Sequence, residues 1–227
     1  MGSFKKMIQK VKDKWKNVGR SHYWGDNLDI RYYLCLKVKA IKDKRVLDIG
    51  CGSGIILSEL DGSNDKFGMD LSREYMDIVP KIDKAIKFII ADMNSMPYKK
   101  GVFDVIMLNA MLPLVSDKQG LIASIYDLLA VDGLFLVTTH NRDHCSYRDE
   151  DSLLSFRDTE NLLSEKFDIN ITGFNPFPRF PYFVPNVIAD KIPYVWEMLT
   201  YFSDRGLFVK KSRALLIEAR KKKSRAL

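Results

Sequence analysis

An acidic residue followed by three evenly spaced glycines, Asp48-x-Gly50-x-Gly52-x-Gly54, is the most chemically distinctive feature of the sequence. An apolar run precedes this motif and the helical pattern of residues 55–60 follows it, so we expect the glycines to form a loop between a strand and a helix. Backbone N–H groups in such a loop can approach a ligand closely. The motif therefore predicts a nucleotide-binding site.

The loop differs from those that bind phosphorylated nucleotides. The dinucleotide fingerprint G-x-G-x-x-G/A ends in a small residue, whereas the bulky Ile55 stands at that position here. The carboxylate of Asp48 would also repel a pyrophosphate, and the Gly-Lys-Ser/Thr of a P-loop is absent from the sequence. The same carboxylate suits an ammonium group. We therefore expect a ligand that is nucleoside-like, cationic and free of phosphates.

Polar residues end the apolar runs that follow the loop. Asp70 stands about 20 residues beyond the motif, as expected for an acid that binds ribose hydroxyls. Asp92 and Asn109 end the next two runs, and Leu128–Val137 has the pattern of a helix, a turn and a strand. In this order and spacing, residues 28–140 resemble the class I S-adenosylmethionine-dependent methyltransferases. Within that class, the chain is similar to the ubiquinone- and menaquinone-pathway group and other enzymes with small acceptors.

The resemblance implies an α/β fold with a Rossmann-like, doubly wound sheet of seven strands. The implied strand order is 3-2-1-4-5-7-6, with strand 7 antiparallel. It further implies S-adenosyl-L-methionine as the cofactor and S-adenosyl-L-homocysteine as the product, with Asp48 holding the amino-acid tail, Asp70 the ribose and Asp92 the adenine amino group. The implied cofactor-binding residues are Asp48, Gly50, Cys51, Gly52, Gly54, Asp70, Leu71, Asp92, Met93, Asn109 and Ala110.

The apolar runs themselves predict a parallel sheet that is covered on both faces, because they are continuous and alternate with helical segments. The expected strands are 45–49, 66–70, 86–90, 103–108, 133–138, 167–172 and 211–219, and a polar helix is expected at 158–165. Ligands bind at the carboxyl ends of such strands. The side chains expected to converge there are Asp48, Asp70, Asp92, Asn109 and His140.

Composition divides the chain into three parts. We expect residues 1–26 to form a basic amphipathic helix and an aromatic turn, residues 27–219 to form the methyltransferase domain with a cap insertion at 173–204, and residues 220–227 to form a basic tail. The net charge is +7, but the first 20 residues carry +6 and the tail carries +5, so the body between them carries −4. A basic body would favour nucleic acid as a partner, whereas basic ends on an acidic body leave that partner open. Without an added RNA-binding module, nucleic acid is less favoured than a small-molecule or lipid acceptor.

The apolar residues of 4–18 recur at spacings of three and four, and the opposite face is almost all lysine. Two interpretations stay open: the helix lies on an anionic membrane surface, or its apolar stripe packs on the domain. The three cysteines lack C-x-x-C spacing, which favours reduced thiols and no metal site. We expect no signal peptide and no membrane span, and hence a cytoplasmic protein, peripheral at the membrane if the helix binds there.

Residues 173–204 combine nine aromatic residues with five of the eight prolines. A segment of this length and composition predicts a cap that forms the apolar wall of an acceptor pocket. The alternative is a plug that packs under the edge of the sheet. The candidate acceptor-pocket residues are Tyr23, Trp24, Arg31, Phe177, Phe180 and Tyr182.

Methyl transfer is an in-line displacement that needs alignment and exclusion of water more than a catalytic group. A hydroxyl or acidic-carbon acceptor would also need a base. His140 is the catalytic candidate, ahead of His22 and His144, and the alternative is a histidine without a role. The segment 109–112 lacks the Asn/Asp-Pro-Pro-Tyr pattern of amino-methylating enzymes, and no Pro-Cys pair suggests cytosine methylation.

The sequence therefore predicts an S-adenosylmethionine-dependent methyltransferase whose acceptor is small and hydrophobic or lipid-linked. Methylation of RNA or protein is one alternative. A non-catalytic subunit that binds S-adenosylmethionine is another.

Overall fold

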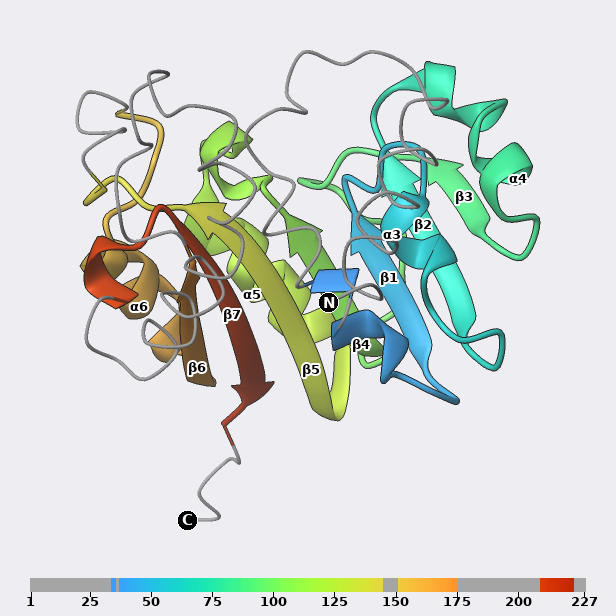
Figure 1. Ribbon diagram of the computed structural model, residues 1–227. Coiled ribbons are helices and arrows are strands. Elements are labelled where there is room, and N and C mark those ends of the chain that lie inside the picture. Colours follow the sequence, from blue (N-terminus) through green and yellow to red (C-terminus); the bar gives the residue numbers. More distant parts are fainter. Residues whose placement is uncertain (1–33, 36, 145–150, 175–208, 223–227) are drawn as a thin grey trace, which may run out of the picture.

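The structure, a computed structural model, describes residues 34–35, 37–144, 151–174 and 209–222. In these ranges the chain forms a twisted sheet with helices on both faces (Figure 1). Helical residues 34–35 and 37–39 precede the first strand. The elements that follow are β1 (Arg45–Ile49), α3 (Ile55–Ser58), β2 (Asp65–Asp70), η2 (Arg73–Met76), α4 (Val79–Ile82), β3 (Lys87–Ile90), β4 (Phe103–Asn109), η3 (Leu112–Leu114), α5 (Lys118–Leu128), β5 (Leu129–His140), α6 (Phe156–Ser164), β6 (Phe167–Phe174), η5 (Val209–Lys211) and β7 (Ala214–Lys221).

The seven strands lie in the order β3-β2-β1-β4-β5-β7-β6. Strands β1 to β5 pair in parallel, whereas β7 lies antiparallel to both β5 and β6. This confirms the predicted order and the antiparallel seventh strand. Because the first five strands run in one direction, their carboxyl ends meet at one edge of the sheet, which is where ligands bind in open α/β folds.

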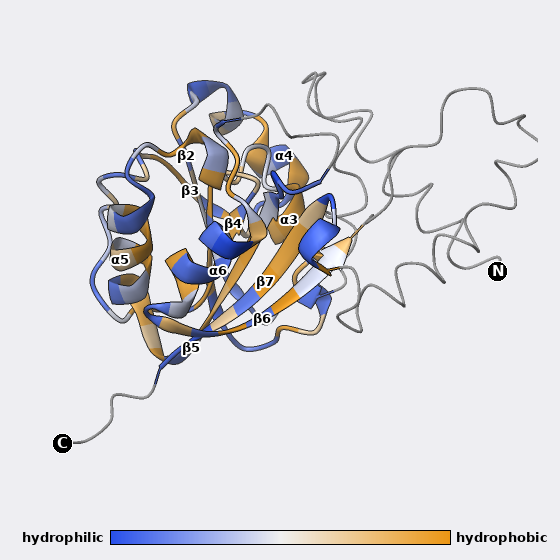
Figure 2. Cartoon of the chain, turned by 90° about the vertical axis from the view of Figure 1, so that its left-hand side faces the viewer, coloured by the Kyte–Doolittle hydropathy of each residue, from blue (hydrophilic) through white to orange (hydrophobic). Residues whose placement is uncertain are grey.

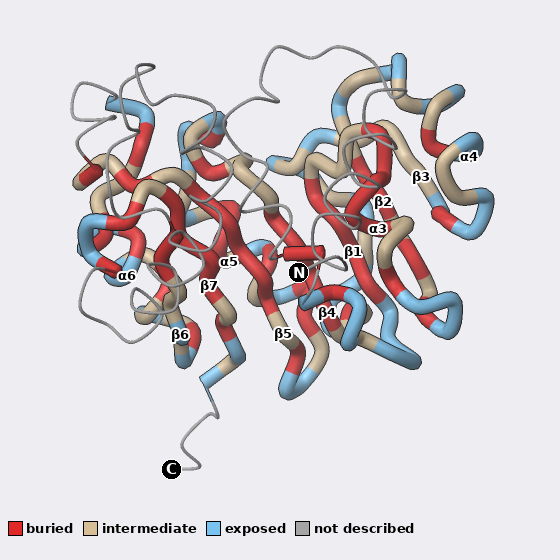
Figure 3. Tube along the Cα trace, in the orientation of Figure 1, coloured by how far each residue is buried: buried red, intermediate tan, exposed pale blue. Residues whose placement is uncertain are grey.

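Two apolar layers enclose the sheet. Helices α5 and α6 cover one face, where Ile125 and Leu163 are fully buried against β4, β5 and β6. The helical residues 34–35 and 37–39, together with α3 and α4, cover the other face, with Val38 and Leu57 fully buried. Figure 2 shows the apolar strands lying between α5 on one side and α3 and α4 on the other, and Figure 3 shows the buried residues following the strands. The strands are therefore buried on both faces, as their continuous apolar sequence predicts.

The strand that follows α5 begins earlier than predicted. Helix α5 ends at Leu128 and β5 starts at once, so the strand expected at 133–138 spans Leu129–His140. Its register against β4 shifts between Phe103 and Val105, and Asp132 has a φ of 60°. The predicted turn between helix and strand is thus an irregular first part of β5. The physical reason is burial, because Leu129 is fully buried where it pairs with β4.

The last two strands correct the predicted boundaries at the C-terminal side. Strand β7 spans Ala214–Lys221, not 211–219, and a 3-10 turn occupies residues 209–211. The first two residues of the predicted basic tail, Arg220 and Lys221, therefore belong to the sheet. Strand β6 runs to Phe174, so the cap predicted at 173–204 starts two residues too early. The remaining cap, the helix predicted at 4–18 and residues 223–227 lie outside the described residues.

Gly173 of β6 leaves no room for a side chain. A methyl group added to it would lie 2.2 Å from Ser212 Oγ and 3.0 Å from the backbone of Val209. We predict that Gly173→Ala lowers the free energy of unfolding by about 1–3 kcal/mol, because the segment entering β7 must move. Urea denaturation measures the loss. Gly62→Ala is the control, since nothing lies within 4 Å of a methyl group there; equal midpoints for the two variants would contradict the prediction.

Candidate functional site

The loop between β1 and α3 turns sharply over the end of β2. Gly50, Gly52 and Gly54 have φ angles of 73°, 53° and 77°, a backbone region that glycine adopts without steric cost. The N–H of Gly50 donates to the carbonyl of Met69 at 2.8 Å, and the N–H of Gly52 donates to Oδ2 of Asp70 at 2.9 Å. The three glycines thus fold the loop against β2 and orient the acidic residue that ends this strand.

Asp48 lies beneath the loop and is almost completely buried. Its side chain is 1% exposed, and Oδ1 has no hydrogen-bond partner among the described residues. Burial, and secondarily the nearby carboxylate of Asp70, raise the pKa of Asp48 to about 8. A buried carboxyl group whose hydrogen bonds are unmet is unfavourable unless a ligand completes them. The group therefore fits a cation with N–H donors, such as an ammonium.

Asp70 ends β2, and Asp92 follows the end of the neighbouring strand β3 by two residues, at the same edge of the sheet. Asp70 Oδ1 accepts from the N–H of Ser72 at 3.0 Å, and its carbonyl accepts from the N–H of Ala91 at 3.1 Å, which joins the two strand ends. Asp92 is exposed, and its Oδ1 accepts from both the backbone and side-chain nitrogens of Asn94 at 2.8 Å. Both carboxylates are therefore oriented by hydrogen bonds while remaining open to solvent or ligand.

Two of the predicted cofactor residues are apolar neighbours of these acids. Leu71 is 70% exposed directly after Asp70, and Met93 packs partly against the core directly after Asp92. An apolar side chain this exposed beside a polar group offers a surface on which a flat ring can lie.

Asn109 ends β4 beside the loop. Thr138 Oγ1, on the neighbouring strand β5, donates to Asn109 Oδ1 at 2.6 Å and accepts from the N–H of Ala110 at 3.1 Å. Ala110 has a φ of 56°, which turns the chain away from the sheet. The carboxamide of Asn109 is thus held by a fully buried threonine.

The sheet register sets several candidate side chains on one face. Asp48 pairs with Met107 and Asn109 pairs with Thr138. Because side chains alternate along a strand, Asp48 and Asn109 share a face, and His140, two residues beyond Thr138, shares it too. His140 is half-buried at the end of β5. The third-ranked candidate, His144, is buried in the following turn.

Tyr75, Met111 and Thr138 adjoin the site, and the sequence did not single them out. A methyl group added to Gly50 would lie 2.7 Å from the sulfur of Met111, and one added to Gly52 would lie 3.7 Å from the ring of Tyr75. Of these three residues, only Thr138 could have been noticed in the sequence, because it is a polar residue within an apolar run. The other two reach the loop through tertiary contacts.

The side chain of Cys51 packs between the loop and β2 and does not act as a nucleophile. A methyl group added to Gly68 of β2 would lie 2.8 Å from its sulfur, so the thiol fills the space above that glycine. Burial, followed by the charges of Asp48 and Asp70, raises the pKa of Cys51 far above its usual value. A thiol that stays protonated is unreactive.

The six predicted acceptor-pocket residues and His22 lie outside the described residues. These are Tyr23, Trp24, Arg31, Phe177, Phe180, Tyr182 and His22.

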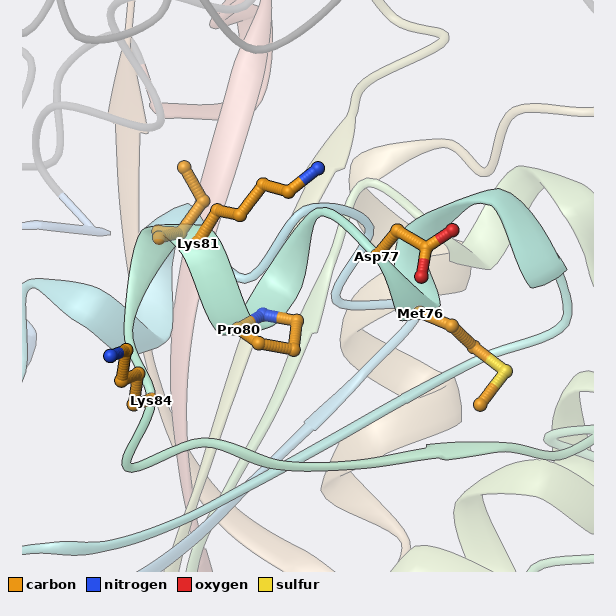
Figure 4. A pocket seen from close by; sticks show the side chains of 6 residues that line it. Met76, Asp77, Pro80, Lys81 and Lys84 are labelled. Atoms are coloured by element: carbon orange, nitrogen blue, oxygen red, sulfur yellow. The ribbon is translucent and has the colours of Figure 1, made fainter.

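Two surface hollows in the described residues are lined by residues other than those of the glycine loop. One, of about 530 Å³, is formed by α4 and the turn before it, and Figure 4 shows side chains such as Met76, Lys81 and Lys84 pointing in different directions from it. The other, of about 1010 Å³, lies over β5, β6 and β7 and is lined by Asp132 and Glu218 among others. Neither contains a predicted cofactor-binding residue. In the described part of the chain, no group of three His, Cys, Asp or Glu residues could hold a metal ion. No described helix is long and apolar enough to cross a membrane.

Residues 25–183 match a family model described as a methyltransferase domain. The match contains the glycine loop and the carboxyl ends of all five parallel strands. The chain belongs to the class I S-adenosylmethionine-dependent methyltransferases.

Relatives of this methyltransferase include two enzymes with named acceptors. The malonyl-[acyl-carrier protein] O-methyltransferase of Legionella pneumophila is 29% identical over 119 residues, covering 50% of this chain and 42% of that enzyme. The ubiquinone biosynthesis O-methyltransferase of Actinobacillus pleuropneumoniae is 31% identical over 128 residues, covering 51% of this chain and 53% of that enzyme. The matched regions thus span about half the length of these enzymes.

Solved structures share the fold of this methyltransferase. The phosphoethanolamine N-methyltransferase 2 of Haemonchus contortus, in complex with S-adenosyl-L-methionine, superposes with a TM-score of 0.60 at 18% identity. The superposition covers 86% of this chain and 53% of that chain. S-adenosylmethionine is the cofactor of the family, and the residues present here fit it. Asp48 offers an unpaired buried carboxyl oxygen to its ammonium group, and the carboxylate of Asp70 is held at the loop where the ribose hydroxyls need an acceptor.

The raised pKa of Asp48 makes cofactor binding depend on pH. Below about pH 8 the group is protonated, and pairing with an ammonium requires that this proton leave. We predict that the affinity for S-adenosylhomocysteine rises by up to about tenfold from pH 6 to pH 7. Calorimetry in buffers of different ionisation enthalpy should show release of about one proton. In Asp48→Asn we expect at least about tenfold weaker binding and no such pH dependence; an unchanged affinity would contradict the assignment of Asp48.

The same carboxyl group should destabilise the cofactor-free protein. Because its pKa is higher in the folded than in the unfolded chain, its contribution to stability is lost as the pH rises from about 4 towards 8. We predict that Asp48→Asn raises the free energy of unfolding by about 1–3 kcal/mol at pH 7 and has little effect at pH 4. Urea denaturation at the two pH values measures this difference, and an equal effect at both would refute it.

Proposed function

We propose that this protein transfers the methyl group of S-adenosylmethionine to a small acceptor that binds at the carboxyl ends of β4 and β5. The observation that carries this proposal is the convergence of Asp48, Asp70 and Asn109 around the glycine loop, since an ammonium, a ribose and a reactive sulfonium need partners at these three places. The two named relatives support it, because both are O-methyltransferases.

The protein residues have distinct roles in this proposal. The bound cofactor supplies an electrophilic methyl group on a sulfonium. Asp48 pairs with its ammonium, Asp70 accepts from its ribose hydroxyls, and Asp92 accepts from its adenine amino group. Leu71 and Met93 flank the adenine. These contacts would fix the position of the methyl group relative to the acceptor, and such alignment lowers the barrier of a bimolecular step.

His140 is the proposed general base for an acceptor that carries a proton on its nucleophilic atom. It lies on the same sheet face as Asp48 and Asn109 and is half-buried at the end of β5. A histidine titrates near neutral pH and is suited to accept such a proton. An acceptor that is already anionic would not require it.

Turnover and cofactor binding test the main proposal separately. We expect the full-length protein to bind S-adenosylhomocysteine by calorimetry and to form it from S-adenosylmethionine in the presence of small carboxylic acids or phenols. Asp70→Ala should weaken binding of both by about tenfold or more, because two charge-assisted hydrogen bonds to the ribose are lost. Asp117→Ala, which removes a helix cap far from the loop, is the control. Binding without turnover on any acceptor, protein and RNA included, would favour the non-catalytic alternative.

The finer proposal is a hydrophobic or lipid-linked acceptor that is reached from a membrane surface. The basic amphipathic pattern of residues 4–18, the aromatic segment 173–204 and the basic C-terminus support it, since stable peripheral binding requires two anchoring signals. RNA binding through the same basic ends is the competing interpretation.

Liposome flotation tests the membrane proposal. We expect the full chain to float with vesicles that contain anionic lipid, and a variant lacking residues 1–20 to remain in the soluble fraction. Neutral vesicles are the control, because the lysine face requires anionic lipid. If both forms behave alike, the proposal fails. A gel shift with RNA that persists at physiological salt would favour the competing interpretation instead.

A further inference from the structure

The hydrogen bonds around Thr138 determine which way the Asn109 carboxamide faces. Thr138 is fully buried, so its hydroxyl must find both its donor and its acceptor within the protein. The N–H of Ala110 is shared between the carbonyl oxygen of Thr138 at 3.0 Å and Thr138 Oγ1 at 3.1 Å, and an N–H can only donate. The hydroxyl oxygen is therefore the acceptor in that bond, and the hydroxyl proton is directed at the other neighbour, Asn109.

The length of the second bond identifies the Asn109 atom that receives this proton. The distance of 2.6 Å from Thr138 Oγ1 to the carboxamide is typical of an O–H···O bond and shorter than an ordinary N–H···O bond. The atom facing the threonine is therefore Oδ1. The reversed carboxamide would leave the hydroxyl proton without its acceptor and would place an amide nitrogen too close to Oγ1.

The amino group of Asn109 consequently points away from β5. In the described part of the chain no carbonyl or carboxylate accepts a hydrogen bond from Nδ2. Asn109 shares its sheet face with Asp48 and ends β4 beside Gly50. Two N–H donors are therefore presented at the edge of the sheet where the acceptor must approach the methyl group.

We propose that Thr138 locks Asn109 as a hydrogen-bond donor to the methyl acceptor, and that the acceptor attacks through an oxygen atom, as a carboxylate or a phenolate. This inference rests on the proposed methyl transfer and narrows its substrate class. A nucleophilic oxygen has one lone pair for attack and another to accept from Nδ2. An amine nitrogen has a single lone pair, and a hydrogen bond to it would block the attack.

For either oxygen acceptor, the bonds and electrons of the methyl transfer are accounted for. The O–CH₃ bond forms as the S–CH₃ bond breaks, and the electron pair of the broken bond stays on sulfur, which becomes a neutral thioether. A carboxylate needs no proton transfer. A phenol must also give its proton to a base, for which His140 is the candidate. A neutral amide suits this role better than lysine or arginine, because it orients the oxygen without neutralising its charge.

Side-chain amide NMR of the full-length protein bound to S-adenosylhomocysteine tests the inference. The probes are sodium acetate, phenol and methylammonium chloride, and Asn109→Asp identifies the Nδ2 resonances by their loss. We expect acetate or phenol to shift these resonances in a saturable manner, and the responding probe distinguishes the two oxygen classes. Methylammonium should have no effect at the same concentration. A shift with methylammonium alone, or no shift with either oxygen probe, would overturn the inference.

Three threonine variants separate a positioning role from a structural one. Thr138→Val keeps the side-chain shape but removes the hydroxyl, so we expect the Asn109 carboxamide to lose its fixed orientation and the response to the oxygen probe to fall by about tenfold. Thr138→Ser should restore the response. Thr139→Val is the matched control, because this neighbouring threonine faces the opposite side of the sheet, and it should respond as the wild type does. An unaltered response in Thr138→Val would overturn the locking role.

Calorimetry with S-adenosylhomocysteine distinguishes the two possible failures. If the wild-type protein does not bind it, the proposed methyl transfer itself is wrong. If it binds and the oxygen probes leave the Nδ2 resonances unchanged, only the acceptor class is wrong.

Discussion

The candidate site is organised by two carboxyl groups that the fold holds close together. Asp48 is buried under the glycine loop, and the charge of Asp70 adds to its desolvation in raising its pKa. The loop keeps them together, because the N–H of Gly52 binds Asp70 and the glycine backbone must adopt positive φ angles to make that bond. Such an arrangement is unfavourable in the free protein and favourable with a cationic ligand, as is common at binding sites.

The pairing of the strands determines on which face and at which edge of the sheet the candidate side chains lie. Parallel pairing of β1, β4 and β5 brings Asp48, Asn109 and His140 to one face at one edge. The antiparallel β7 then supports the end of β5 from the other side. The carboxamide of Asn141, directly after β5, donates to the carbonyls of Lys210 and Ser212 at 3.1 and 2.9 Å. The strand end that carries His140 is therefore anchored on both sides, which restricts the motion of the side chains above it.

Much of this organisation was predictable because it depends on local pattern. The glycine spacing and the alternation of apolar runs with helices predicted the loop and the parallel strands, and the family resemblance that these motifs carry implied the strand order. The polar residues that end the runs marked the edge where ligands bind in such folds. Boundaries were less predictable where burial outweighs local preference. Leu129 looked like the end of a helix and is the start of β5, and Arg220 and Lys221 looked like a tail and lie in β7.

Residue identity alone thus specified the family and its fold, and it predicted the residues that we propose to meet the cofactor, since each depends on spacing along the chain. The contacts among Tyr75, Met111 and the glycine loop depend on which segments fold over it, and no spacing encodes them. The orientation of the Asn109 carboxamide is the clearest example of a feature that only the tertiary structure decides. It follows from a hydrogen bond to Thr138, 29 residues away, and only the register between β4 and β5 brings the two side chains within 2.6 Å.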